Sequence, residues 1–369
     1  MRHLDEYRDP VAVRRVTARI RESLARLAPA RPLQIMEFCG GHTHAIYRYG
    51  LHDLLPDTLE WVHGPGCPVC VLPRERIDAA VELARRPEVI LTTFGDVLRV
   101  PGTAASLQSV RGQGADVRVV YSPLDALALA RREPRRQVVF FAVGFETTAP
   151  ATAFTVLQAA AEGVANFSVL CQHITSPQVL RTLLDDPDLH LDGIVAPGHV
   201  CTVVGAGAFA FVAGEYRLPI VVSGFEPLDL LQSLALLLQQ RLEGRCELEN
   251  QYRRAVTAAG NPAALEAIEQ VFEPAPQAAW RGLGAIPDSS LRLRPAYAAF
   301  DAERRFGLAG EGASEAETLP CGEVLKGRLR PGQCPHFGNR CRPESPLGAL
   351  MVSSEGACAA WYRYRRRAA

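Results

Sequence analysis

The chain has 369 residues, 48% of them hydrophobic and 22% charged, which is the composition of a globular protein with two or three domains. Its 40 basic and 40 acidic side chains cancel to a formal net charge of zero. No global field therefore attracts nucleic acid or an anionic membrane, and we expect neither as a partner.

The N-terminal region, residues 10–28, combines scattered arginines with an amphipathic helical pattern. A secretory signal needs an unbroken apolar stretch, so this pattern predicts a helix and no signal. The longest stretches free of both charge and histidine have 15 residues, fewer than the roughly 20 apolar residues that a membrane span needs. We therefore expect a cytoplasmic protein.

Apolar runs and helical patterns then alternate along the chain. Runs typical of strands occupy residues 33–38, 88–93, 116–120, 137–143, 167–170, 193–196 and 218–222. Helical patterns between them cover residues 74–85, 124–131, 150–161 and 228–242. Continuous apolar strands that alternate with helices indicate parallel sheets covered on both faces. Folds of this class carry their functional side chains in loops at the C-terminal ends of strands.

A weak internal repeat predicts how these elements divide. The paired blocks are EFCGG (37–41) with GFETT (144–148), HGPGC (63–67) with APGHVC (196–201), and TFGD (93–96) with SGFE (223–226). We therefore expect two related α/β domains, residues 1–133 and 134–240, whose loops face a shared cleft. Coincidence is the alternative, because Gly-Pro loops after strands are common.

The remaining residues, 241–369, differ in character. Helical pieces broken by prolines run to residue 300, and residues 306–358 are rich in Gly, Pro and Cys. A segment of that composition buries little apolar area and usually needs a metal to hold it. We expect a third, C-terminal domain that is partly helical and partly irregular.

Four cysteines in this last segment form the first candidate site. Cys321, Cys334, Cys341 and Cys358 are separated by 12, 6 and 16 residues. Thiols stay reduced in the cytosol, so metal binding is a better interpretation than disulfides. Four thiolates suit a structural zinc or a four-iron cluster. Zinc sites usually contain close C-x2-C pairs, and none occurs here, but the spacing alone leaves the choice open.

Three N-terminal cysteines form the second candidate site. Cys39 follows a predicted strand and precedes two glycines, and we expect helix-start amides beyond it to lower its pKa. Cys67 and Cys70 flank a Pro-Val pair, a spacing that suits either a disulfide or two metal ligands. Buried, inert thiols are the alternative. His42 and His44 are candidate catalytic residues or ligands, although histidines in polar turns more often orient a neighbour.

Further polar residues are expected to line the same cleft. They are Thr93, Asp96, Arg99, Pro101, Glu146, Thr147, Thr148, His199 and Glu226. An acid directly after a strand is often only a helix cap, so capping and cleft roles are equally open for Asp96 and Glu226. The sequence has no dinucleotide or phosphate-loop motif in the glycine-rich stretches.

These blocks together resemble the HypD family of [NiFe]-hydrogenase maturation proteins. The matching segments are MEFCGGHTHAIYRYG, HGPGCPVC, TTFGDVLRVPG, GFETTAPATA, APGHVCTVVG, SGFEPLD and the four late cysteines. They follow the order of the family from about residue 10 to residue 365. No departure occurs at the cysteine positions.

The resemblance implies a fold of two related α/β domains plus a domain that carries a [4Fe–4S] cluster on Cys321, Cys334, Cys341 and Cys358. It implies that Cys39, Cys67 and Cys70 are the essential thiols, as iron ligands and redox groups. It also implies a small HypC-like chaperone as partner and a HypE-like cyanide donor.

The function implied is an assembly scaffold rather than a conventional enzyme. The scaffold and its HypC-like partner would hold the iron on which the Fe(CN)2CO group of the hydrogenase is assembled. Two alternatives remain. One is an oxidoreductase in which the cluster feeds electrons to Cys67 and Cys70 for use on a protein substrate. The other is an α/β enzyme that acts on a small molecule and has a structural cluster.

Overall fold

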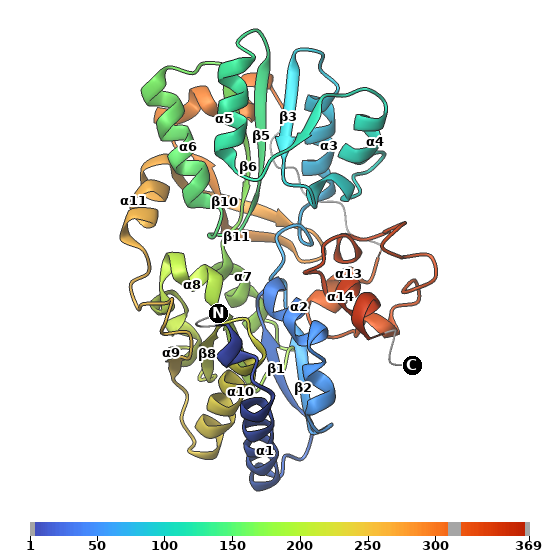
Figure 1. Cartoon of the computed structure of the whole chain (residues 1–369), viewed down its shortest axis with the longest axis vertical. Helices are drawn as coiled ribbons and strands as arrows, with labels where there is room; N and C mark the ends of the chain where they lie inside the picture. The colour runs from blue at the N-terminus through green and yellow to red at the C-terminus, as the bar shows by residue number, and fades with distance from the viewer. Residues whose placement is uncertain (1–3, 309–318, 366–369) are drawn as a thin grey trace.

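The computed structural model describes residues 4–308 and 319–365. The chain forms two lobes, each built on a parallel sheet, with a C-terminal segment beside them (Figure 1). This confirms the expected α/β class. No helix in the described part of the chain is long and apolar enough to cross a membrane.

The lower lobe in Figure 1 contains a five-stranded sheet in the order β2-β1-β7-β8-β9. Its strands are β1 (Leu33–Glu37), β2 (Leu59–His63), β7 (Gly193–Pro197), β8 (Ile220–Ser223) and β9 (Leu248–Asn250). All four pairings are parallel, with Glu37 opposite His63 on one side and Val195 on the other.

Helices α1 (Pro10–Leu27) and α10 (Pro227–Leu242) pack together against one face of this sheet. The start of α1 is fixed by Pro10 at its first position and by Asp9, whose side chain accepts a hydrogen bond from the Val11 amide. The helices α2 (Gly40–Arg48), α8 (Gly198–Val204) and α9 (Ala210–Gly214) complete this lobe.

The upper lobe contains a four-stranded parallel sheet in the order β4-β3-β5-β6. Its strands are β3 (Val89–Thr93), β4 (Val117–Val119), β5 (Gln137–Gly144) and β6 (Phe167–His173). The helices around it are α3 (Arg74–Ala84), α4 (Leu107–Gly112), α5 (Pro123–Arg132), α6 (Ala149–Glu162), α11 (Pro262–Val271) and α12 (Ala302–Phe306). Helix α7 (Ser176–Leu184) leads back to the lower lobe.

The two sheets do not follow the expected boundary between residues 133 and 134, and that prediction was wrong. Strands β1 and β2 share a sheet with β7, β8 and β9, whereas β3 and β4 pair with β5 and β6. The sequence analysis grouped strands by their order in the chain. Parallel strands are joined by long crossovers, so a neighbour in sequence need not be a neighbour in the sheet.

The region from 246 to 300 also differs from the expected helical pieces. It contains a long antiparallel hairpin of β10 (Phe272–Trp280) and β11 (Gly284–Leu293). The pairing register shifts between Ala275 and Gln277, which places Pro276 in the irregularity. Prolines are tolerated at bulges and on strands with a free edge, and both strands of a two-stranded sheet have one.

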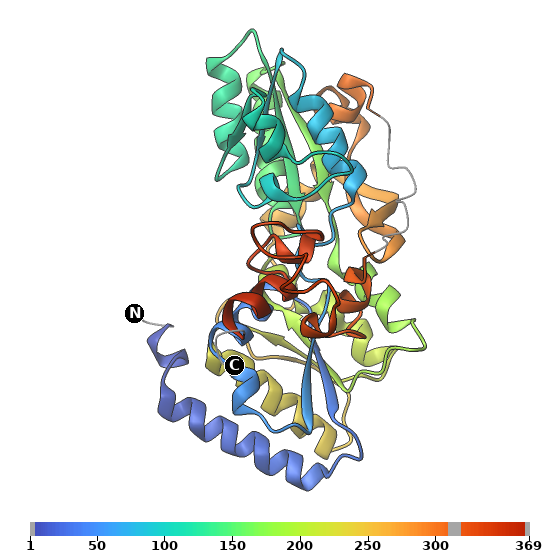
Figure 2. The same ribbon diagram turned by 90° about the vertical axis from the view of Figure 1, so that its right-hand side faces the viewer.

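The C-terminal segment lies at the waist between the lobes (Figure 2). Its regular structure is limited to α13 (Cys321–Leu325), α14 (Ala357–Tyr364) and short 3-10 turns. Leu350, Met351 and Val352 belong to the same core cluster as Met36 of β1 and Leu91 of β3, so this core runs through both lobes and the waist.

Candidate functional site

A cavity of about 370 Å³ lies where the C-terminal ends of strands from both sheets meet. Its lining comes from the loops after β1, β2, β3, β5, β6 and β7, together with Glu355 of the C-terminal segment. The expectation that loops of both sheets face a shared cleft is therefore confirmed. We call this space the cleft.

Cys39 lies at the junction of β1 and α2 and lines the cleft. Its amide donates a hydrogen bond to Glu37 Oε2 at 3.0 Å, and Thr43 and His63 donate to Glu37 Oε1. Gly66 of the next loop lies so close that an added Cβ would be 2.3 Å from the Cys39 nitrogen. One buried carboxylate and one glycine contact thus fix the Cys39 backbone.

The acidity of the Cys39 thiol differs from the sequence expectation. Burial raises its pKa above the ordinary value, and the nearby carboxylates of Glu355 and Glu37 raise it further. Hydrogen bonds from the Gly41 and His42 amides lower the pKa, as expected of a helix start, but burial outweighs them. The free thiol is therefore protonated at neutral pH, and a bound cation would have to displace that proton.

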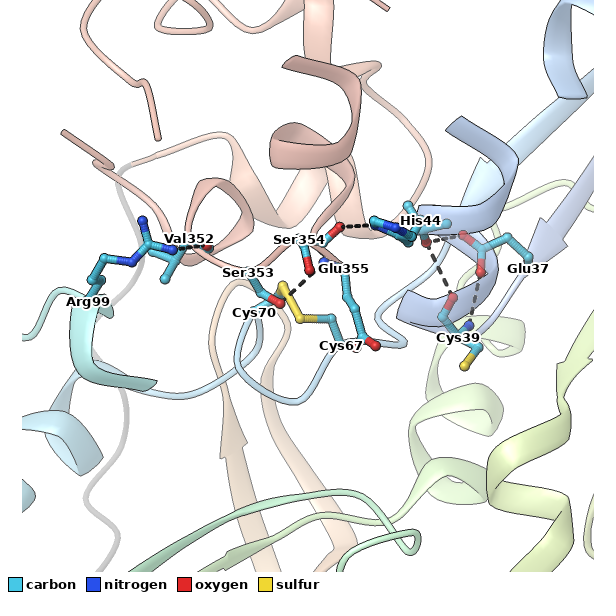
Figure 3. Close-up of a disulfide and its surroundings, with 11 residues drawn as sticks. Glu37, Cys39, His44, Cys67, Cys70, Arg99, Val352, Ser353, Ser354 and Glu355 are labelled. Carbon is cyan, nitrogen blue, oxygen red and sulfur yellow. Dashed lines mark hydrogen bonds between the residues drawn. A yellow bond between two sulfur atoms is a disulfide. The ribbon is translucent and has the colours of Figure 1, made fainter. Parts of the chain in front are cut away.

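Cys67 and Cys70 form a disulfide in the loop after β2, with Cα atoms 5.3 Å apart. The two side chains are only 4% and 2% exposed. Cys67 faces the Cys39 loop and Cys70 faces the C-terminal segment, so the pair lies between the two (Figure 3).

The four late cysteines line one apolar cavity in the C-terminal segment. The residues concerned are Cys321, Cys334, Cys341 and Cys358. Burial and the proximity of the other three thiols raise the pKa of Cys358. The Leu347 amide donates to the Cys341 sulfur at 3.4 Å, and Gly348 has no side chain to meet the Cys321 sulfur. The structure thus brings the four residues together around one cavity.

This donor set fits an iron–sulfur cluster. Four thiols around one apolar space, with an amide directed at a sulfur, are what cluster ligation requires. In the described residues no three His, Cys, Asp or Glu side chains are close enough to hold a single metal ion. A cluster of four irons accepts thiolates that are further apart than one zinc ion does.

Comparison with known proteins extends the similarity to the whole chain. Residues 12–365 match the HypD family, described as "Hydrogenase formation hypA family". The chain is 54% identical to hydrogenase maturation factor HypD of Rhodobacter capsulatus, covering 99% of this chain and 98% of the relative. It is 53% identical to the protein of that name from Escherichia coli K12, covering 100% and 99%.

The chain belongs to the HypD family of hydrogenase maturation factors. A third relative, from Azotobacter vinelandii, is 52% identical over 100% of this chain and 98% of its own length and carries the same name. The resemblance based on the motif blocks is therefore confirmed.

In this HypD-family chain the two predicted histidines lie outside the cleft lining. His42 is fully buried, stacks on Phe225 and donates from Nε2 to the Ser223 carbonyl at 3.2 Å. His44 points to the C-terminal segment and donates from Nδ1 to the Ser354 carbonyl at 3.1 Å (Figure 3). Both therefore position main-chain segments around the cleft.

The other expected cleft residues divide into two groups. Asp96, Thr147, Thr148 and His199 line the cleft. The lining does not include Thr93, Arg99, Pro101, Glu146 or Glu226. The Thr93 hydroxyl donates a hydrogen bond to the Phe141 carbonyl, and the Arg99 guanidinium donates one to the Val352 carbonyl. The Pro101 carbonyl accepts one from Arg281. Glu226 occupies the N-cap position of α10, its amide donates to Asp229, and its carboxylate pairs with Arg8, so it belongs to the helix start and not to the cleft. Asp96 lies in the cleft lining, so the structure favours a cleft role for this residue.

Glu146 lies outside the cleft lining and stabilises one of its walls. Its carboxylate accepts hydrogen bonds from the Ser176 amide at 2.6 Å and the Ser176 hydroxyl at 2.9 Å. Burial raises the pKa of Glu146 to about 7, although both hydrogen bonds act in the opposite direction. Since Ser176 begins α7 and lines the cleft, Glu146 fixes that wall.

Two residues of the site, Glu37 and Glu355, were not predicted from the sequence. The Glu37 carboxylate accepts hydrogen bonds from the Cys39 amide, Thr43 and His63, yet the sequence pattern placed it only at the end of a strand. Glu355 is the one residue from beyond position 200 in the cleft lining that the structure describes. The local signal was weak: Glu355 is the one charged residue in the run from Ala349 to Trp361.

Proposed function

We propose that this chain is the scaffold that holds iron while the Fe(CN)2CO group of a [NiFe] hydrogenase is assembled. Its partners in this role would be a small HypC-like chaperone and a HypE-like cyanide donor. The observation that carries the proposal is the position of Cys39 in a cleft of about 370 Å³, as the one cysteine of its described lining. The iron is cargo and must leave again.

The chemistry of the cleft supports this role. Low-spin iron that carries cyanide and CO is soft, and a thiolate suits it better than carboxylates do. One thiolate holds such an iron without the closed cage that four thiolates would form, so a partner must supply further ligands and release remains feasible. The raised pKa of Cys39 keeps the thiol neutral until a cation displaces its proton.

The disulfide adds a redox function to the proposal. Reduction of the Cys67–Cys70 bond takes up two electrons and two protons and yields two thiols, which become candidate iron ligands beside Cys39. The cysteines Cys321, Cys334, Cys341 and Cys358 would hold a [4Fe–4S] cluster, which supplies one-electron transfer when bound.

The burial of the disulfide favours the scaffold over an oxidoreductase that acts on protein substrates. Thiol–disulfide exchange requires a thiolate of the substrate to reach one sulfur. Cys67 and Cys70 are 4% and 2% exposed, and the C-terminal segment lies against Cys70, so a thiol carried on a folded protein cannot reach them as a small free thiol can.

Infrared spectroscopy of the chain, purified anaerobically with its small partner, tests the proposal. Metal-bound cyanide and CO absorb where proteins do not. We expect these bands in the wild type and in Cys246→Ala, which removes a partly exposed thiol remote from the cleft lining. Cys39→Ala should lose the bands and keep its thermal stability. Bands of full strength in Cys39→Ala would show that Cys39 is not a necessary ligand.

A further inference from the structure

One short segment of the C-terminal region contacts every part of the thiol site. We call residues 352–358 the strap. Arg99 donates to the Val352 carbonyl at 3.0 Å, and His44 donates to the Ser354 carbonyl at 3.1 Å. Arg99 follows β3 of the upper lobe and His44 lies on α2 of the lower lobe, so the strap bridges the two (Figure 3).

Glu355 extends from the strap into the cleft beside Cys39. Its side chain packs directly on Gly40, where an added Cβ would lie 2.5 Å from Glu355 Cβ and 2.7 Å from Oε2. Real atoms do not approach so closely, so Gly40 leaves space that the Glu355 side chain fills. Glu355 therefore covers the backbone next to Cys39, and both residues line the cleft.

The next residues of the strap reach the other two cysteine sites. A Cβ on Gly356 would lie 3.0 Å from the Cys70 sulfur and 2.3 Å from the Leu350 carbonyl, so the strap backbone lies against the disulfide. Cys358, two residues later, lies in the first turn of α14 and lines the cavity of the four cysteines. Cys358 cannot shift without moving Gly356 and Glu355.

We propose that Glu355 is a positioning residue for the chemistry at Cys39, and that cluster binding by the four late cysteines holds it in place through the strap. The inference rests on the cluster assigned in the proposed function. With the cluster bound, Cys358 is anchored, the strap is fixed against Cys70, and Glu355 shields Cys39. Without it, the strap loses its anchor at Cys358, and Glu355 leaves Gly40. Iron could then be held correctly only by a chain whose cluster is already present.

Alkylation of Cys39 by iodoacetamide, quantified by mass spectrometry of the whole purified chain, measures this shielding without any hydrogenase activity. We expect Cys39 in the cluster-free Cys334→Ala variant to react about tenfold faster than in the cluster-containing wild type, the factor expected from the loss of one or two hydrogen bonds of the strap. Cys246, outside the strap contacts, serves as the internal reference and should react equally in both.

Two pairs of variants separate the effects of the strap and of Glu355 from general loss of structure. Gly356→Ala should accelerate Cys39 alkylation while the cluster absorbance remains, whereas Gly214→Ala, where a Cβ meets no atom within 4 Å, should change nothing. Glu355→Ala should also expose Cys39. Glu355→Gln keeps the side-chain volume but removes the carboxylate that raises the pKa of Cys39, so Cys39 should react faster than in the wild type and more slowly than in Glu355→Ala.

The experiments distinguish failure of the proposed cluster, of the coupling and of the role of Glu355. Absence of cluster absorbance from the wild-type chain after anaerobic reconstitution with iron and sulfide would contradict the proposed cluster and the coupling with it. A bound cluster together with equal Cys39 rates in the wild type, Cys334→Ala and Gly356→Ala would overturn the coupling alone. Equal exposure in Glu355→Ala and Glu355→Gln would remove the positioning role of the Glu355 side chain.

Discussion

At the scale of single residues, the cleft is built from buried carboxyl groups that act on main-chain amides. Glu37 orders the turn that bears Cys39, and Glu146 orders the start of α7. Glu37 is fully buried and Glu146 is 5% exposed. Such groups are costly to bury, and each is retained where it fixes a wall of the cleft.

The titration of Glu146 should be visible in the stability of the chain. Burial raises its pKa from 4.5 to about 7 in the folded state. Between these two pH values the unfolded chain has released the proton while the folded chain still holds it. The contribution of Glu146 to stability therefore falls as pH rises through this window and is level above it, at about 1.4 kcal/mol for each unit of pKa difference.

Denaturant unfolding at a series of pH values measures this dependence. Glu146→Gln has no proton to release, so the free energy of unfolding of the wild type minus that of Glu146→Gln should decrease between pH 4.5 and 7. Glu266→Gln on the exposed face of α11 should keep the full wild-type slope. Parallel curves for the wild type and Glu146→Gln would contradict the buried titration.

At the scale of elements, the loops after β1 and β2 meet backbone to backbone. The Gly40 amide donates to the Gly66 carbonyl at 2.9 Å, and Gly66 abuts Cys39. Gly66→Ala would insert a Cβ 2.3 Å from the Cys39 nitrogen and force the loops apart. We expect a loss of about 1–3 kcal/mol in stability, as for overpacked cores, measured by urea unfolding.

A matched control is available in α4. A Cβ on Gly112 would meet no atom within 4 Å, so Gly112→Ala should unfold at the wild-type urea concentration or above it. If Gly66→Ala unfolds at the same midpoint as Gly112→Ala, the contact between the two loops does not constrain Cys39.

The loop after β2 should behave as a two-electron redox pair. The Cα separation of 5.3 Å is normal for a disulfide, so both states are accessible to the loop with little backbone movement. Alkylation and mass spectrometry in buffers of graded thiol potential should show Cys67 and Cys70 titrating together, with about 30 mV for each tenfold change in their equilibrium. Independent alkylation of the two thiols at every potential would leave them as metal ligands only.

Sequence patterns predicted most elements and both cysteine groups, because their signals are local. The apolar strands and the capped helices, such as α5 with Ser122, Pro123 and Asp125 at its start, follow directly from short-range rules. The pairing partners of the strands could not be predicted, because pairing across long crossovers leaves no signal in the local sequence. Glu355 was missed for the same reason: it joins the cleft through a contact with Gly40, more than 300 residues away.

At the scale of the whole molecule, the chain passes between the lobes repeatedly. It leaves the lower sheet after β2, builds the upper sheet with β3 to β6, and returns with β7. Neither lobe is therefore a continuous piece of sequence. The cleft between them is bordered by chain crossings, and the strap joins it from the waist.

This interleaving predicts that residues 1–133 do not fold alone. That fragment contains β1 and β2 without β7, and β3 and β4 without β5, so each partial sheet keeps an unpaired apolar edge. Circular dichroism and proteolysis of the purified fragment should show little stable structure compared with the full chain. Cooperative unfolding of the isolated fragment would contradict the topology.

The same topology has a consequence for how the protein is made. The 129 residues between His63 and Gly193 must leave the ribosome before β7 can pair with β1. At ~5–20 residues per second this takes on the order of ten seconds. During that time Cys39, Cys67 and Cys70 are attached to a strand pair with an open edge. The nascent chain is thus exposed to stray metal, oxidants and aggregation until its lower sheet closes, and cells that produce it quickly would need to protect these thiols.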